Sequence, residues 1–185
     1  MRGRGRERGS LRVACALAAL VSGAPCAARA EDSNVRLRGA PGMAVRRAIE
    51  GASLRLEEPA CQRVFTDFSD VAGRPLDAVL KELGQTPGSY LRSLVLFYDG
   101  SSQLRCAAGQ ILGGTQPGSR IIYICPVPFF ETDRRDKRAT EVFIIHETLH
   151  SLGLGENPPA PVEIDWRVMK RCRERAASSA KASDR

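Results

Sequence analysis

Residues 141–159 read EVFIIHETLHSLGLGENPP, and this stretch decides how the rest of the chain is interpreted. Placed on a helix, this segment has two stripes of residues that are expected to be buried. One stripe contains Val142, Ile145, Leu149 and Leu152. The other contains Phe143, His146, His150 and Gly153. The pattern predicts a helix that is buried on two sides, against the apolar core on one side and against whatever the histidines bind on the other.

The two histidines are four residues apart, and the chain has no others. On a helix this spacing places both imidazoles on one face, where they can bind a single metal ion. Glu147 lies beside them and can act as a base toward a metal-bound water. The alternative is a pair of core histidines that hydrogen-bond to the backbone. The spacing, the adjacent glutamate and the glycine that follows favour the metal site.

The segment that contains these histidines and Glu147 resembles the zincin metallopeptidases. Its continuation to Gly153 resembles the metzincins, in which the helix ends at a glycine so that the chain turns back with a third ligand. Glu156 stands where metzincins commonly have histidine, so the resemblance implies a carboxylate as third protein ligand, as in the gluzincins. It also implies a small α+β zincin-like domain, whose mixed sheet packs on the active-site helix and a C-terminal helix.

Three carboxylates compete for the third ligand position. Glu156 is favoured because it follows the Gly153 turn, and the sequence Asn-Pro-Pro at 157–159 keeps helix from resuming there. Glu163 and Asp165 are the alternatives. Both lie near the start of a final helix, where acidic side chains also interact favourably with the helix dipole.

The ligand set His146, His150 and Glu156 implies Zn²⁺ with a fourth position open for water. Glu147 is then the general base that takes a proton from the zinc-bound water and passes it to the leaving amine. The expected activity is a zinc metallopeptidase acting on a peptide or protein. Two other interpretations stay open: a secreted binding module in which zinc only fixes the fold, and a zinc amidase acting on cell-wall or other non-protein amides.

Two further expectations concern the cleft. An oxyanion formed during hydrolysis needs a hydrogen-bond donor, and Tyr123, Tyr98 and Arg120 are candidates by side-chain type. The zincin resemblance also implies that a strand such as 121–125 lines the cleft and pairs with an extended peptide.

The first thirty residues have the features of a signal peptide. Five arginines precede a run of apolar residues at 13–21, interrupted by Cys15, and Ala28-Arg29-Ala30 supplies small residues for cleavage. We expect cleavage after Ala30 and a secreted or periplasmic protein without a stable membrane anchor, because a transmembrane helix needs about 20 apolar residues. The predicted catalytic domain is then 31–175, and 176–185 is a flexible polar tail.

The charge of the chain lies mostly in this leader. The whole sequence has 28 basic and 21 acidic residues, but residues 1–30 contain six arginines and one glutamate. The remaining chain therefore has 22 basic and 20 acidic residues, a net charge of +2. This composition gives no support for nucleic acid as a partner.

Four cysteines remain after the leader, an even number that predicts two disulfides in an oxidising compartment. The favoured pairing joins Cys106 to Cys125 and Cys61 to Cys172, the latter tying the early chain to the last helix. A four-cysteine zinc site is the alternative, but the sequence lacks a Cys-x-x-Cys pair.

Hydrophobic periodicity outlines the other elements. It predicts helices at 43–56, at 75–83 and from about residue 161, and strands at 93–98 and 121–125. The second strand is apolar on both faces and is expected to be buried. Met169 can be compared with the methionine turn of metzincins, but it shares a helical stripe with Val162 and Trp166, and this stripe is expected to pack in the core.

Overall fold

A computed structural model describes residues 34–109 and 111–173. The predicted signal peptide (1–30), its cleavage site and the predicted tail (176–185) lie outside these residues. The described chain forms α1 (Gly39–Leu56), α2 (Pro59–Gln62), η1 (Arg63–Phe65), α3 (Leu76–Glu82), α4 (Pro87–Ser93), β1 (Leu96–Asp99), α5 (Leu104–Ala107), β2 (Gly113–Gly114), β3 (Ile121–Ile124), α6 (Pro126–Arg135), α7 (Lys137–Ser151) and α8 (Pro161–Arg171). The predicted α+β class with a mixed sheet is confirmed. None of these helices has the length and apolar character that a membrane span requires.

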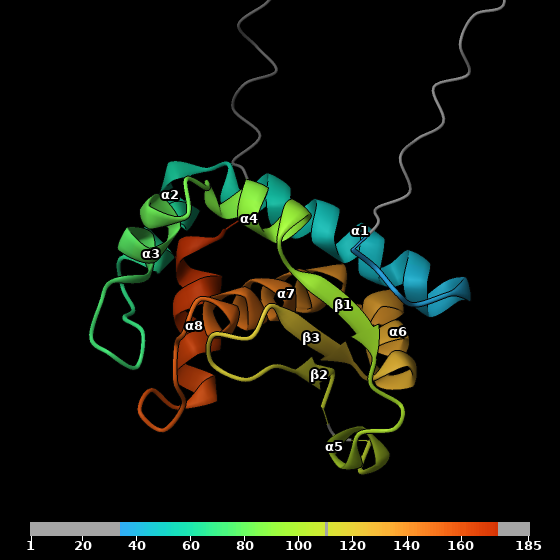
Figure 1. Ribbon diagram of the computed structural model, residues 1–185. Coiled ribbons are helices and arrows are strands. Elements are labelled where there is room, and N and C mark those ends of the chain that lie inside the picture. Colours follow the sequence, from blue (N-terminus) through green and yellow to red (C-terminus); the bar gives the residue numbers. More distant parts are fainter. Residues whose placement is uncertain (1–33, 110, 174–185) are drawn as a thin grey trace, which may run out of the picture. The chain divides into compact units, whose positions relative to one another are not determined.

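The sheet has three strands in the order β1-β3-β2 (Figure 1). β1 is parallel to β3, with Leu96 opposite Ile121, whereas β2 is antiparallel to β3, with Gly113 opposite Ile124. The strand predicted at 93–98 starts later than expected, because Pro87 begins a helix that continues to Ser93.

β3 lines the pocket with Ile121 and Tyr123, as expected from the sequence, but it is the central strand and cannot pair with a peptide as expected. Both of its edges are occupied, one by β1 and the other by β2, so no backbone groups remain for pairing with a peptide. The strand is also not buried on both faces, because Tyr123 is 37% exposed. Its alternate residues Ile122 and Ile124 are fully buried.

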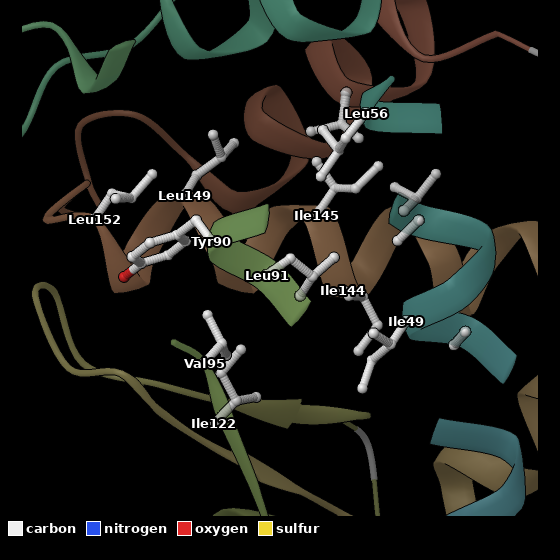
Figure 2. Packing of buried hydrophobic residues seen from close by; sticks show 14 of the residues in the cluster. Ile49, Leu56, Tyr90, Leu91, Val95, Ile122, Ile144, Ile145, Leu149 and Leu152 are labelled. Carbon is white, nitrogen blue, oxygen red and sulfur yellow. The ribbon is translucent and has the colours of Figure 1, made fainter. Parts of the chain in front are cut away.

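The core forms around α7. Ile144, Ile145 and Leu149 of this helix are fully buried. They meet side chains of α1, α4 and the sheet, including Ile49, Leu91 and Ile122 (Figure 2). The predicted apolar stripe of α7 is confirmed, because Val142 and Leu152 are buried as well as Ile145 and Leu149. Burial on this scale supplies most of the stabilisation that orders a helix of this length.

The prediction that Met169 packs in the core is wrong. Met169 is 44% exposed, and its stripe partners Val162 and Trp166 are also exposed. The face of α8 that packs in the core instead contains Ile164 and Val168, both fully buried. Both faces have helical spacing, and the packing of α8 against α7, α2 and η1 decides which one turns inward.

Both favoured disulfide pairings are confirmed. Cys61 is joined to Cys172 across 111 residues, and Cys106 is joined to Cys125 across 19 residues. The first bridge links α2 to the end of α8 and is buried with the core. Two disulfides in one small domain indicate an oxidising environment.

Candidate metal centre

Helix α7 ends in a turn that reverses the chain. Gly153 has a φ of 111°, a left-handed conformation that favours glycine, and its N–H donates to the carbonyl of His150. A side chain at this position would also meet the neighbouring loop, since a Cβ built there lies 2.9 Å from Cβ of Asp70. The predicted glycine turn therefore has a structural basis, and it brings residues 154–156 back beside the helix.

Three side-chain atoms converge next to this turn. Nε2 of His146 and Nε2 of His150 are 2.9 Å apart, and Oε1 of Glu156 lies 3.2 Å from the His150 nitrogen and 3.8 Å from the His146 nitrogen. Ligand atoms about 2.1 Å from a tetrahedral ion lie about 3.4 Å from one another. The observed separations bracket this value, so the cluster can hold a metal ion.

The other ring nitrogen of each histidine has its own partner. Nδ1 of His150 is 2.7 Å from the carbonyl oxygen of Leu154, and Nδ1 of His146 is 2.7 Å from Oδ1 of Asp165. A carbonyl oxygen only accepts, so the hydrogen bond to Leu154 places the proton of His150 on Nδ1. Such partners fix the orientation and tautomer of metal-binding histidines, leaving Nε2 free to bind.

The structure separates the three candidates for the third ligand. Glu156 lies in the cluster, as favoured from sequence. Glu163 is instead paired with Arg167 at 2.6 Å, one helical turn further along α8. Asp165 is neither a ligand in the cluster nor only a helix-dipole partner, because its carboxylate contacts His146.

The neighbouring charges shift the pKa values of both histidines. Burial lowers the pKa of His146, but the hydrogen bond to Asp165 and the charge of Glu147 outweigh it, and the net shift is upward. The pKa of His150 is lowered, first by burial and also by the proximity of His146. Metal binding requires both rings in the neutral form, so protons compete with a metal at low pH.

Glu147 is buried beside the cluster, with only 6% of its surface exposed. Its carboxylate accepts a hydrogen bond from the backbone N–H of Thr115, but within the described residues Oε2 has no hydrogen-bond partner. Burial raises the pKa of Glu147 to about 7. A carboxyl group with this pKa exchanges protons readily near neutral pH, as a general base must.

These side chains line an open pocket of about 1530 Å³. Of the three candidate oxyanion donors, only Tyr123 lines it. Tyr98 contacts the ring of Tyr123, with centroids 6.4 Å apart, and Arg120 interacts with the hydroxyl of Tyr90 instead. Met169, predicted to lie in the core, is also part of the pocket wall.

Sequence reasoning missed three polar partners of the site. The N–H of Thr115 and the carbonyl of Leu154 are backbone groups, which every residue type provides, so no sequence signal identifies them. Asp165 was considered only as a ligand or a helix-dipole partner. Its contact with His146 depends on how α8 packs against α7.

No protein-family model matches this chain, and neither a curated protein nor a solved structure matches it. The resemblance to the zincins therefore rests on residues 146–156 and on the site geometry.

Proposed function

We propose that the protein is an exported zinc metallopeptidase in which His146, His150 and Glu156 bind the metal and Glu147 is the general base. The observation that carries this proposal is a buried carboxylate oxygen of Glu147 that has no hydrogen-bond partner in the described part of the chain and lies beside three converging donor atoms in an open pocket. Two histidines and one carboxylate form the ligand set of catalytic zinc sites that keep an open position.

The proposed reaction is hydrolysis of a peptide bond. When bound, zinc supplies a Lewis acid that acidifies water and polarises a carbonyl. Glu147 accepts a proton from the attacking water, whose oxygen adds to the carbonyl carbon, and it then passes the proton to the leaving nitrogen as the C–N bond breaks. One water is consumed, and one carboxylate and one amine are formed. Of the three candidate donors, Tyr123 is the one that lines the pocket, and we assign it the hydrogen bond to the oxyanion.

The outer edge of β2 offers a place for the substrate backbone. The N–H of Cys125 donates to the carbonyl of Leu112, so Leu112 and Cys125 form a hydrogen-bonded pair. Such pairs alternate along an antiparallel ladder, so the next pair, Gly113 and Ile124, is not hydrogen-bonded. The N–H and C=O of Gly113 therefore point away from β3, where an extended peptide can pair with them. This edge strand replaces β3 in the role expected from the sequence.

An open site with an available base distinguishes an enzyme from a structural zinc site, which is fully ligated by protein side chains. The test uses the purified oxidised protein, loaded with one equivalent of zinc and incubated with a defined mixture of peptides. Mass spectrometry then identifies new termini. Internal cleavage by the wild type and its loss in Glu147→Gln, with zinc content unchanged, are expected. Tightly held zinc without any cleavage would overturn the proposal and favour a zinc-stabilised binding module.

A further inference from the structure

The pocket continues along α7 well beyond the metal centre. Its floor includes Arg138, Val142, Phe143, His146, Glu147 and His150, all from this helix. Pro161, Asp165 and Met169 of α8 form one wall, and residues 113–119 form part of another. A substrate longer than the reacting group therefore has a continuous surface to contact.

Arg138 lies at the far end of this surface, two helical turns before His146. Its Nε atom is buried and has no hydrogen-bond partner among residues 34–109 and 111–173. Nη2 donates to the carbonyl of Met169, but the distance of 3.5 Å makes this a weak bond. No carboxylate of the described chain forms an ion pair with it. A partly buried guanidinium that lacks a counter-ion is poorly compensated, and it favours an incoming anion.

The direction of a bound peptide follows from the direction of β2. A Cβ built on Gly113 lies 3.0 Å from the ring of Phe143, the N–H of Thr115 donates to Glu147, and the N–H of Gly118 donates to the carbonyl of His150. As the residue number rises along 113–118, the residue contacted on α7 also lies further along the chain. β2 and the loop after it run in the same direction as α7.

A peptide that pairs antiparallel with β2, the more common arrangement of strands, runs opposite to α7. Its C-terminal part then lies toward the N-terminal end of the helix, where Arg138 is. Arg138 and His146 are eight positions apart, which corresponds to about 12 Å of helix. An extended chain covers this distance in three or four residues, at about 3.4 Å each.

We propose that Arg138 binds a carboxylate of the substrate on the C-terminal side of the cleaved bond, about three residues from it. The inference rests on the proposed peptidase function and names the class of substrate for that site. The carboxylate has two sources, the free C-terminus of a short peptide or an Asp or Glu side chain in a longer one.

Hydrolysis of matched peptides tests the proposal and separates the two sources. One pair ends three residues after the cleaved bond as a free acid or as an amide. A second, longer pair has Glu or Gln at this third position. The wild type is expected to prefer the acid of at least one pair by about tenfold in kcat/KM. In Arg138→Gln the preference should fall to within about twofold, with partial recovery in Arg138→Lys. Equal rates for acid and neutral peptides in both pairs, or an acid preference that survives in Arg138→Gln, would overturn it.

Two control variants make the result specific. Arg135→Gln removes an exposed guanidinium that pairs with Glu131 outside the main pocket, so the acid preference should persist. Arg105 also lines the pocket, and loss of the preference in Arg105→Gln alone would assign the carboxylate to Arg105 and reject Arg138. The unfolding temperature of each variant shows whether its fold is intact.

A binding measurement distinguishes failure of this inference from failure of the proposed function. The Glu147→Gln variant, loaded with zinc, is titrated with the same acid and amide peptides by calorimetry. Tighter binding of the acid, reduced by Arg138→Gln, supports the carboxylate site even if the wild type cleaves no peptide. Equal affinities alongside normal cleavage by the wild type reject the carboxylate site and leave the peptidase proposal intact.

Discussion

Two buried glutamates on α7, six residues apart, have opposite environments. Glu141 is 8% exposed and accepts hydrogen bonds on both oxygens, from Arg47 at 2.6 Å and from Arg55 at 2.7 Å. Glu147 is 6% exposed, receives one backbone hydrogen bond, and has no ion pair with an arginine or lysine of the described chain. The same residue type is therefore fully paired near one end of the helix and largely unpaired near the other.

The difference separates a carboxylate held in ion pairs from one that can exchange a proton. Glu141 joins α7 to two arginines of α1, and the approach is close enough that a Cβ built on Gly51 would lie 2.3 Å from the Glu141 carboxylate. A buried carboxylate without such partners has a raised pKa and is a candidate for proton transfer. The ion pairs of Glu141 support a structural role, and the environment of Glu147 supports its proposed role as general base.

Glu147→Gln is expected to have the largest effect. Loss of the base should reduce kcat/KM for peptide hydrolysis by roughly 10²–10⁴-fold. Zinc content and the unfolding temperature should stay close to those of the wild type, because the amide has a similar size and removes an unpaired buried charge. Steady-state kinetics and elemental analysis measure both. Undiminished hydrolysis would remove Glu147 from the mechanism.

Glu141→Gln is the matched substitution at the paired site. It should leave zinc affinity unchanged but lower the free energy of unfolding by about 2–3 kcal/mol, because Arg55 loses its paired carboxylate and Arg47 keeps only its ion pair with Asp133. The value lies at the lower end for buried ion pairs, since these arginine side chains remain 27% and 14% exposed. Urea unfolding measures the change. A stability equal to that of the wild type would mean that the two glutamates do not differ as argued.

Substitutions at the candidate metal centre are expected to have smaller effects, and they test the ligand assignment separately. Glu156→Gln should weaken zinc binding by at least about tenfold, and Asp165→Asn by about tenfold through misorientation of His146. Glu163→Gln should leave the affinity unchanged, because Glu163 pairs with Arg167. Competition with a chelator gives all three affinities. A large loss confined to Glu163→Gln would contradict the assignment of Glu156.

The smallest expected effect concerns Asp67, a second acid paired with arginine. Two hydrogen bonds of 2.7 Å join it to Arg171, and this interaction lowers the pKa of Asp67 below its usual 3.8. A lowered carboxyl pKa stabilises the fold above the unfolded-state value and loses this contribution as the pH falls through the folded-state value. Asp67→Asn should therefore be less stable by about 1 kcal/mol or less at pH 6, with the difference vanishing near pH 2. Urea unfolding at both values measures it, and a constant difference would exclude this ion pair as the cause.

Much of the fold was predictable because its signals are local. Helical spacing in 141–152 identified α7, and the even number of cysteines after residue 30 predicted the two disulfides. The position of the first strand was not predictable in the same way. Residues 93–95 have strand-like composition, yet Pro87 and the side chain of Thr86, which accepts from the N–H of Ser89, start a helix that includes Ser93.

The buried face of α8 was also not predictable from the sequence. Its two apolar stripes have the same helical period, so periodicity does not say which one enters the core. Packing against α2 and the bridge from Cys61 to Cys172 buried Ile164 and Val168, and left Met169 beside the pocket.

The sequence by itself determined the elements of the site that are close together along the chain. Residues four apart on a helix lie on the same face, so His146 and His150 do so, and Gly153 allows the turn that returns Glu156 to them. Tertiary structure alone decided the contact of Asp165 with His146, the unpaired state of Glu147 and the choice of β2 as the open edge. Asp165 is 19 residues from His146, and Thr115 is 32 residues from Glu147, so only packing of the helices and the sheet brings these residues together.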